Sequence, residues 1–267
     1  MQVKTGFATI HNTKLYFEMA GKGKPLILLH SGIADHRMWL VQQRELARFF
    51  RVVTADFRGY GGTAPPSGSF WHYEDIHELI QYLGFDSVNI VGCSLGGKAA
   101  MELAIAYPQV VDSLILVAPG LTGYEYRDKE TLEKDTMLEK LIAGDRREDV
   151  ADMLVDIWVV GLRRRRDMVS SGARALVRRM ILDNYDSVVD KYPEAAPTFD
   201  LIAGLSEIRA PTLVVIGDSD LPDMLAISQL VTDKIPDSRR RVIHDAAHLL
   251  NLEHSTIFNQ IVVDSLV

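Results

Sequence analysis

The sequence predicts an α/β fold: a mostly parallel sheet with helices on both faces and a helical insertion. Short apolar runs typical of buried strands alternate with helical patterns over most of the chain. The alternation stops between residues 120 and 200, where apolar residues keep helical spacing. With 267 residues, 47% of them apolar and 24% charged, the chain can bury a large core and lacks the composition of a disordered protein.

The expected elements follow in chain order, and glycine and proline mark several of their ends. Tyr107 and Pro108 end a helix rich in small residues, because proline lacks an N–H and biases the preceding residue away from helical angles. We expect strands at residues 6–10, 15–18, 25–30, 52–55, 87–92, 114–117, 212–216 and 241–244, and helices at residues 38–49, 74–83, 95–106, 224–232 and from 256 onward.

Two stretches of sequence, residues 1–119 and 201–267, are expected to form one core domain. Residues 120–200 are expected to form a cap, helical throughout, over one end of the sheet. Leu138, Leu141 and Ile142, for example, have the spacing of one apolar helix face.

Composition and charge exclude several classes of protein. No apolar run approaches the ~18–20 residues of a membrane-spanning helix, and residues 1–14 lack the apolar segment of a secretory signal. We therefore expect a cytoplasmic protein with no membrane partner. The net charge of −7 disfavours binding to nucleic acid. The four arginines at residues 163–166 are expected to form a solvated helix end paired with nearby acids.

Cysteine and histidine usage argues against a metal site. The single cysteine, Cys93, cannot form an intrachain disulfide or a cysteine-rich zinc site. The eight histidines show no spacing typical of a helical metal site. We expect no metal and no cofactor, and the sequence does not specify an oligomeric state.

The strongest motif is Gly-Cys-Ser-Leu-Gly-Gly at residues 92–97, between an expected strand and an expected helix. This is the context of a nucleophile elbow, in which Gly-x-Ser-x-Gly lifts a serine hydroxyl above the sheet. Glycines two residues either side relieve the crowding of so tight a turn. The motif predicts Ser94 as a nucleophile, with the N–H of Leu95 directed at the group that Ser94 attacks. Cys93 precedes the apex, so we expect its side chain to point away from the pocket.

A serine nucleophile needs a base and an acid that orients the base. His248 follows the expected strand at 241–244, and Asp220 follows the strand at 212–216, both at strand ends where open α/β sheets hold their active sites. We predict His248 as the base and Asp220 as the acid. Asp218 on the same turn is the alternative acid. His244, expected to close a strand, and His254, expected on the last helix, are the weaker candidates for the base.

The loop after residues 25–30 is expected to supply a second N–H to the oxyanion. Gly32 is the first choice and Ile33 the alternative, because an unhindered backbone N–H suits this role. His30 is expected to brace the loop by hydrogen bonds. Asp56 and Arg58 are expected to form an ion pair that holds the glycine-rich loop at residues 59–62.

Taken in order, these motifs resemble the α/β-hydrolase superfamily, in its cap-bearing serine hydrolase branch. The resemblance also covers Asp-Phe-Arg-Gly-Tyr-Gly at 56–61, Arg-Ala-Pro-Thr-Leu-Val at 209–214 and Asp-Ala-Ala-His at 245–248. It implies an eight-stranded sheet, the triad Ser94, Asp220 and His248, and an oxyanion hole formed by Gly32 and Leu95. Residues 245–252 look most like the esterase and 3-oxoadipate enol-lactonase members.

Two departures narrow the chemistry. Serine at the elbow apex argues against haloalkane dehalogenases and epoxide hydrolases, which use a carboxylate nucleophile. Cys93 stands where C–C bond hydrolases of the family often carry asparagine, which makes that chemistry less expected.

We therefore predict a serine hydrolase that cleaves a carboxylic ester or lactone of a small, largely apolar substrate. Related triad chemistry (C–C bond hydrolysis, peracid formation or acyl transfer) and a slow-turnover ligand receptor of the same fold remain alternatives. Five residues are candidates to line the pocket or to pack helices: Trp71, Tyr124, Tyr126, Met153 and Trp158.

Overall fold

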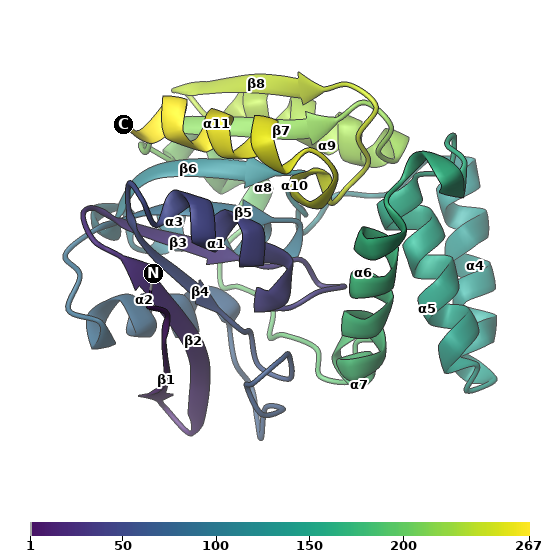
Figure 1. Cartoon of the computed structure of the whole chain (residues 1–267), viewed down its shortest axis with the longest axis horizontal. Helices are drawn as coiled ribbons and strands as arrows, with labels where there is room; N and C mark the ends of the chain where they lie inside the picture. The colour runs from purple at the N-terminus through teal and green to yellow at the C-terminus, as the bar shows by residue number, and fades with distance from the viewer. Residues whose placement is uncertain (1) are drawn as a thin grey trace.

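A computed structural model describes residues 2–267. Eight strands form one sheet in the order β1-β2-β4-β3-β5-β6-β7-β8 (Figure 1). The pairs β1–β2 and β2–β4 are antiparallel, and all the others are parallel, which confirms the predicted mostly parallel sheet. The strands are β1 Lys4–Ile10, β2 Thr13–Gly21, β3 Pro25–Leu29, β4 Arg51–Ala55, β5 Val88–Cys93, β6 Val111–Val117, β7 Thr212–Gly217 and β8 Ser238–Ile243.

Helices cover both faces of the sheet, as predicted. Successive side chains of a strand point to opposite faces, so Ile27 and Leu29 of β3 join the apolar cluster under α2, α3 and α9, whereas Leu26 and Leu28 join the cluster under α1 and α11. The helices that flank the sheet are α1 Leu40–Leu46, α2 His72–Tyr82, α3 Leu95–Ala106, α8 Leu201–Gly204, α9 Pro222–Lys234, α10 Leu250–Glu253 and α11 Ser255–Leu266.

The remaining helices stand at the end of the sheet toward which the arrows of β6 and β8 point (Figure 1). They are α4 Lys129–Ala143, α5 Arg147–Val155, α6 Ser171–Asp183 and α7 Tyr185–Val188, and a π-helical turn, Asp156–Val160, continues α5. Four short 3-10 turns complete the set: His36–Trp39, Pro108–Val110, Arg166–Met168 and Leu205–Glu207.

The expectation that residues 120–200 are helical throughout is wrong. Residues 189–200 contain no helix, and Pro193 and Pro197, which cannot donate a backbone hydrogen bond, lie within this stretch. It returns to the core, where the N–H of Ala195 donates to the carbonyl of Phe70 at 3.0 Å. The division into a core and a cap stays a prediction.

Several element boundaries also differ from prediction, and three of these differences change how a segment or a candidate histidine is placed. The helix expected at 38–49 is a 3-10 turn followed by the shorter α1, and Asp35 caps the turn through the N–H of Arg37. Strand β8 ends at Ile243, so His244 does not close it. His254 precedes α11 as its cap residue and is not within that helix.

Three of the four arginines at 163–166 pair with acids, as expected, but one of these three is not solvated. Arg165 pairs with Asp167 at the surface, and Arg166 pairs with Asp156. The side chain of Arg164 is only 5% exposed, because it reaches inward to Glu253. None of the helices in residues 2–267 is both long enough and apolar enough to span a bilayer.

Candidate active site

Ser94 occupies a sharp turn between β5 and α3. Its backbone has φ 53° and ψ −110°, a conformation that non-glycine residues rarely adopt and that costs about 1–3 kcal/mol. The flanking glycines are required by close packing: a Cβ on Gly92 would lie 2.3 Å from the carbonyl oxygen of Gly96, and one on Gly96 would lie 2.4 Å from that of Leu29. The turn is fixed further by a 2.9 Å hydrogen bond from the N–H of Ser94 to Val117.

His248 and Asp220 form a buried pair. Nδ1 of His248 lies 2.8 Å from Oδ2 of Asp220, and the two side chains are 2% and 1% exposed. The other carboxylate oxygen accepts a 2.8 Å hydrogen bond from the N–H of Leu221. The carboxylate therefore orients the imidazole with Nδ1–H toward Asp220, which leaves Nε2 as the proton acceptor.

The alternative acid and bases lie elsewhere. Asp218 binds Nδ1 of His244 at 2.9 Å, and the side chain of that histidine is 87% exposed. Nε2 of His254 lies 3.2 Å from the carbonyl oxygen of Asp245. Of the candidates, the structure brings Asp220 to His248 and leaves Asp218 on an exposed pair.

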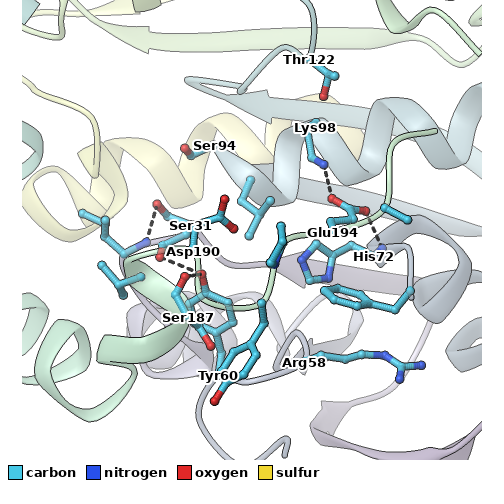
Figure 2. Close-up of a pocket in the computed structure, with 18 of the residues that line it drawn as sticks. Ser31, Arg58, Tyr60, His72, Ser94, Lys98, Thr122, Ser187, Asp190 and Glu194 are labelled. Carbon is cyan, nitrogen blue, oxygen red and sulfur yellow. Dashed lines mark hydrogen bonds and ion pairs between the residues drawn. The ribbon is translucent and has the colours of Figure 1, made fainter. Parts of the chain in front are cut away.

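A cavity of about 590 Å³ contains both Ser94 and His248 in its lining (Figure 2). Its wall also includes Gly32, Leu95 and Trp158, whose indole lies 4.5 Å from the His248 ring between centroids. Within residues 2–267 no hydrogen bond joins Ser94 to His248. Such contacts are often long in a site without substrate and tighten when substrate binds.

Gly32 and Leu95 are neighbours at this cavity: a Cβ on Gly32 would lie 3.7 Å from the Cβ of Leu95. Neither backbone N–H donates a hydrogen bond within the part of the chain that the structure describes, so both can bind an oxyanion. The N–H of Ile33, the alternative donor, is directed instead at Oγ of Ser31 at 3.5 Å.

The prediction that His30 braces this loop is confirmed. Its Nε2 accepts a 3.0 Å hydrogen bond from the N–H of Phe57, and its Nδ1 lies 2.9 Å from the carbonyl oxygen of Ser31. Burial lowers the pKa of His30, so the ring is neutral and donates from Nδ1.

The expected ion pair between Asp56 and Arg58 is wrong. Arg58 pairs with Asp75 in a buried two-bonded contact at 2.6 and 2.7 Å. Asp56 accepts hydrogen bonds from the N–H groups of His36 and Gly62, at 2.7 and 2.8 Å, and so holds the glycine-rich loop without Arg58. Sequence alone cannot pair these groups, because Asp75 lies on α2, far along the chain.

One cluster has the composition of a metal site. Ligand atoms of Asp35, His36 and Asp56 lie within 4.8 Å of one another. Both carboxylates already bind protein groups, however: Asp35 accepts from Arg37 and from the amide of Asn184, the residue that precedes α7. The cluster therefore connects the start of α7 to the loops that contain Asp35 and Asp56.

Cys93 lies beneath the elbow and is fully buried, and burial raises the pKa of its thiol. A thiol in this environment is a poor nucleophile.

The cavity wall differs in part from the predicted one. Of the five candidate aromatic and methionine residues, only Trp158 lines it. Tyr124 donates to Asp223, and Trp71 donates to the carbonyl of Ala196. Most of residues 187–197 and Lys98 also line the cavity, and the sequence did not predict this role for them. Lys98 could have been found, because residues i and i+4 share a helix face and Ser94 precedes it by one turn.

A family model for the alpha/beta hydrolase fold matches residues 24–255. The chain belongs to this family. Two curated hydrolases match this alpha/beta hydrolase over 96% of its length and 92% of theirs. The 2-hydroxy-6-oxo-6-phenylhexa-2,4-dienoate hydrolase of Burkholderia cepacia is 26% identical, and the 2-hydroxy-6-oxononadienedioate/2-hydroxy-6-oxononatrienedioate hydrolase of Comamonas testosteroni is 25% identical.

Solved structures of the same fold include enzymes described as esterases and a lactone-degrading enzyme. A thermophilic esterase from Thermogutta terrifontis matches this hydrolase with a TM-score of 0.81 and 24% identity, over 100% of this chain and 98% of that one. Est816, described as an N-acyl homoserine lactone degrading enzyme, matches with a TM-score of 0.79 and 26% identity, over 98% and 100%. The family and fold predicted from the motifs are confirmed, and the resemblance to enol-lactonases stays a prediction.

Proposed function

We propose that this hydrolase cleaves a carboxylic ester or lactone of a small, largely apolar substrate through an acyl-enzyme on Ser94. One observation carries the proposal: the strained turn of Ser94 and the His248–Asp220 pair meet at one cavity. Three groups from distant parts of the chain converge there in the roles that nucleophilic acyl transfer requires.

The reaction follows from the roles of these groups. Nε2 of His248 takes the proton from Oγ of Ser94 as that oxygen attacks the acyl carbon, and the N–H groups of Gly32 and Leu95 stabilise the oxyanion. The intermediate collapses when His248 gives the proton to the leaving alkoxide, so that the alcohol departs. Water then attacks the acyl-enzyme, His248 takes its proton and returns it to Oγ of Ser94, and the acid is released.

Asp220 acts through the imidazole. Its carboxylate fixes the Nδ1–H tautomer and stabilises the imidazolium that forms during each proton transfer.

The cavity supports a small substrate with an apolar part. Leu95, Leu154 and Trp158 contribute apolar surface to its wall beside Ser94 and His248. An acyl or alcohol group of a few carbon atoms would be removed from water against these side chains.

C–C bond hydrolysis is the second candidate, because the two curated relatives that match over nearly the full chain are hydrolases named for oxo-dienoate substrates. The same triad would serve that reaction, and Cys93, in place of the asparagine frequent in such enzymes, weighs against it. Peracid formation, acyl transfer and a slow-turnover receptor use the same residues.

A fluorophosphonate probe and 4-nitrophenyl esters test the proposal together. We expect the probe to label wild-type protein on Ser94, and Ser94→Ala to lose labelling and about 10⁴-fold or more of kcat while its circular dichroism spectrum is unchanged. A folded wild-type protein that the probe does not label, or a Ser94→Ala variant that retains full activity, would falsify the mechanism. A panel of esters, lactones and 1,5-diketones then separates ester hydrolysis from C–C cleavage.

A further inference from the structure

Lys98 lies one helical turn beyond Ser94 on α3. Its N–H donates to the carbonyl oxygen of Ser94 at 2.9 Å, and its side chain points into the cavity that contains Ser94 (Figure 2). The side chain is 16% exposed, and that exposure is toward the cavity it lines. A helical rise of about 1.5 Å per residue separates the two Cα atoms by about 6 Å along the axis. An ammonium group therefore lines the same cavity as the candidate nucleophile.

The protein does not use all the hydrogen-bond donors of this ammonium group. Nζ binds Oε2 of Glu194 and lies 3.6 Å from Oε1 of Glu102, beyond hydrogen-bond distance. Neither carboxylate oxygen of Glu102 has a hydrogen-bond partner within residues 2–267, and burial raises the pKa of this carboxyl to about 7. A lysine ammonium has three N–H donors, and only one is used by Glu194.

Glu194 is itself held in place by the core. Its other oxygen accepts a 2.7 Å hydrogen bond from the backbone N–H of His72, and Figure 2 shows this chain of contacts from Lys98 through Glu194 to His72. Nδ1 of His72 is buried and has no hydrogen-bond partner within residues 2–267. Burial lowers the pKa of this imidazole well below its ordinary value, so the ring is neutral.

The other charged groups at the cavity do not compete for Lys98. Arg58 donates two hydrogen bonds to Asp75 and a third to Asn12, and its side chain is 3% exposed, so its donors are taken by the protein. Asp190 is exposed and lies with Ser187 in Figure 2, away from Lys98. The cavity that Ser94 lines therefore also contains a cation with unused N–H donors.

We propose that Lys98 is a specificity-determining residue that pairs with a carboxylate of the substrate. The apolar part of the substrate then spans the distance between this carboxylate and the carbonyl that Ser94 attacks, and Glu194 balances the charge of Lys98 in the empty site. This inference rests on the proposed function.

Three esters of similar size test the inference. 4-Nitrophenyl hydrogen glutarate carries a carboxylate on the acyl side, 4-carboxyphenyl valerate carries one on the alcohol side, and 4-nitrophenyl valerate is neutral. In Lys98→Met, kcat/KM for one of the anionic esters, relative to the neutral ester, is expected to fall about 10- to 100-fold, because a charge-assisted contact is lost. The ester affected identifies the side of the substrate that carries the carboxylate.

Two further variants and a control sharpen this experiment. Lys98→Arg keeps the charge and is expected to retain the preference for the anionic ester. Glu194→Gln removes the competing carboxylate and is expected to raise that preference severalfold. Lys129→Met is the control, because it removes the same charge from an α4 side chain that is 90% exposed. Its kcat/KM for the anionic esters relative to the neutral ester should stay at the wild-type value.

The inference is overturned when Lys98→Met leaves kcat/KM of both anionic esters, relative to the neutral ester, within about twofold of the wild-type value. Hydrolysis of the neutral ester that depends on Ser94 would still support the proposed function, so the two failures are distinguishable. Should no ester be hydrolysed, calorimetry with monomethyl glutarate decides: binding that weakens about tenfold or more in Lys98→Met supports the inference, and equal or absent binding overturns it.

Discussion

The elements at the carboxyl edge of the sheet and the helices α4 to α7 are held in place in different ways. Helix α3, which begins at the elbow, buries eight of its 12 residues, whereas α4 buries one of its 15, Thr131. The elbow is fixed by glycines in backbone contact and by the adjoining strands. Among α4 to α7 and the turns between them, exposed ion pairs join one element to another. Examples are Arg166 with Asp156 and Arg178 with Asp152.

This difference separates residues that are fixed by backbone packing from residues that are held by exposed polar contacts. A group on the buried edge cannot move or change size without disturbing backbone packing, so its position is defined closely. A surface pair in residues 120–200, such as Arg166 with Asp156, is held by a few polar contacts and can be exchanged at little cost in stability. Lys98 lies on the packed helix α3 and pairs with Glu194 on the segment after α7, so the proposed specificity contact joins the two regions.

The largest expected effect concerns the two neighbouring aspartates of the edge. Asp220→Asn should lower kcat by about 10³- to 10⁴-fold, because an amide cannot enforce the Nδ1–H tautomer of His248 or stabilise its charged form. Asp218→Asn alters only an exposed pair and should change kcat less than about threefold. Steady-state hydrolysis of a 4-nitrophenyl ester measures both, and a larger loss in Asp218→Asn would reverse the assignment.

Substitution of two arginines, one in a buried ion pair and one in an exposed ion pair, compares how much each pair contributes to the unfolding free energy. Arg58→Met leaves Asp75 as an unpaired buried carboxylate and should cost about 3–5 kcal/mol of unfolding free energy. Arg166→Met breaks a pair whose side chains are about half exposed and should cost less than about 1 kcal/mol. Urea denaturation measures both variants, and equal losses would contradict the contrast drawn above.

A smaller effect is expected from the pH dependence of Glu102. The pKa of this buried carboxyl rises from 4.5 to about 7 on folding, so the folded chain binds its proton more tightly than the unfolded chain. Stability therefore falls as the pH rises through this interval, by about 2 kcal/mol in order of magnitude. Glu102→Gln removes the titrating group, and its unfolding free energy relative to wild type should rise between pH 5 and pH 8.

Denaturation at several pH values measures this change. Glu133→Gln, on the exposed face of α4, is the control and should show no such trend. A Glu102→Gln variant that parallels wild type across the pH range would contradict the raised pKa.

Much of the fold could be predicted because local sequence specifies it. Helix α3 was predicted over its full length, since small residues follow the elbow and Pro108 stops the helix. Strands β5 and β7 were predicted within one residue at each end, because central parallel strands are continuously apolar. Strand β8, expected at residues 241–244, starts three residues earlier, at Ser238, because it pairs in parallel with β7 across arginines that carry no strand pattern.

The errors in pairing charged residues share one cause, which is contact between residues far apart in sequence. Nothing near Arg58 indicates that its partner is Asp75, and nothing near Lys98 indicates Glu194, which arrives from the non-helical end of the cap region. Ion-pair partners do not recur at a fixed spacing in the sequence. The sequence therefore shows which charged residues are present, but it does not show which of them pair in the folded chain.

The sequence by itself determined the alternating strands and helices, the elbow at Ser94 and the order of the candidate acid and base, because periodicity and glycine placement are local properties of the chain. Only the tertiary structure decided that Asp220, not Asp218, reaches His248, that Ile33 gives its N–H to Ser31, and that Lys98 faces the cavity beside Glu194. These outcomes depend on distances across the folded chain, which are set by how the elements pack together and not by any one segment.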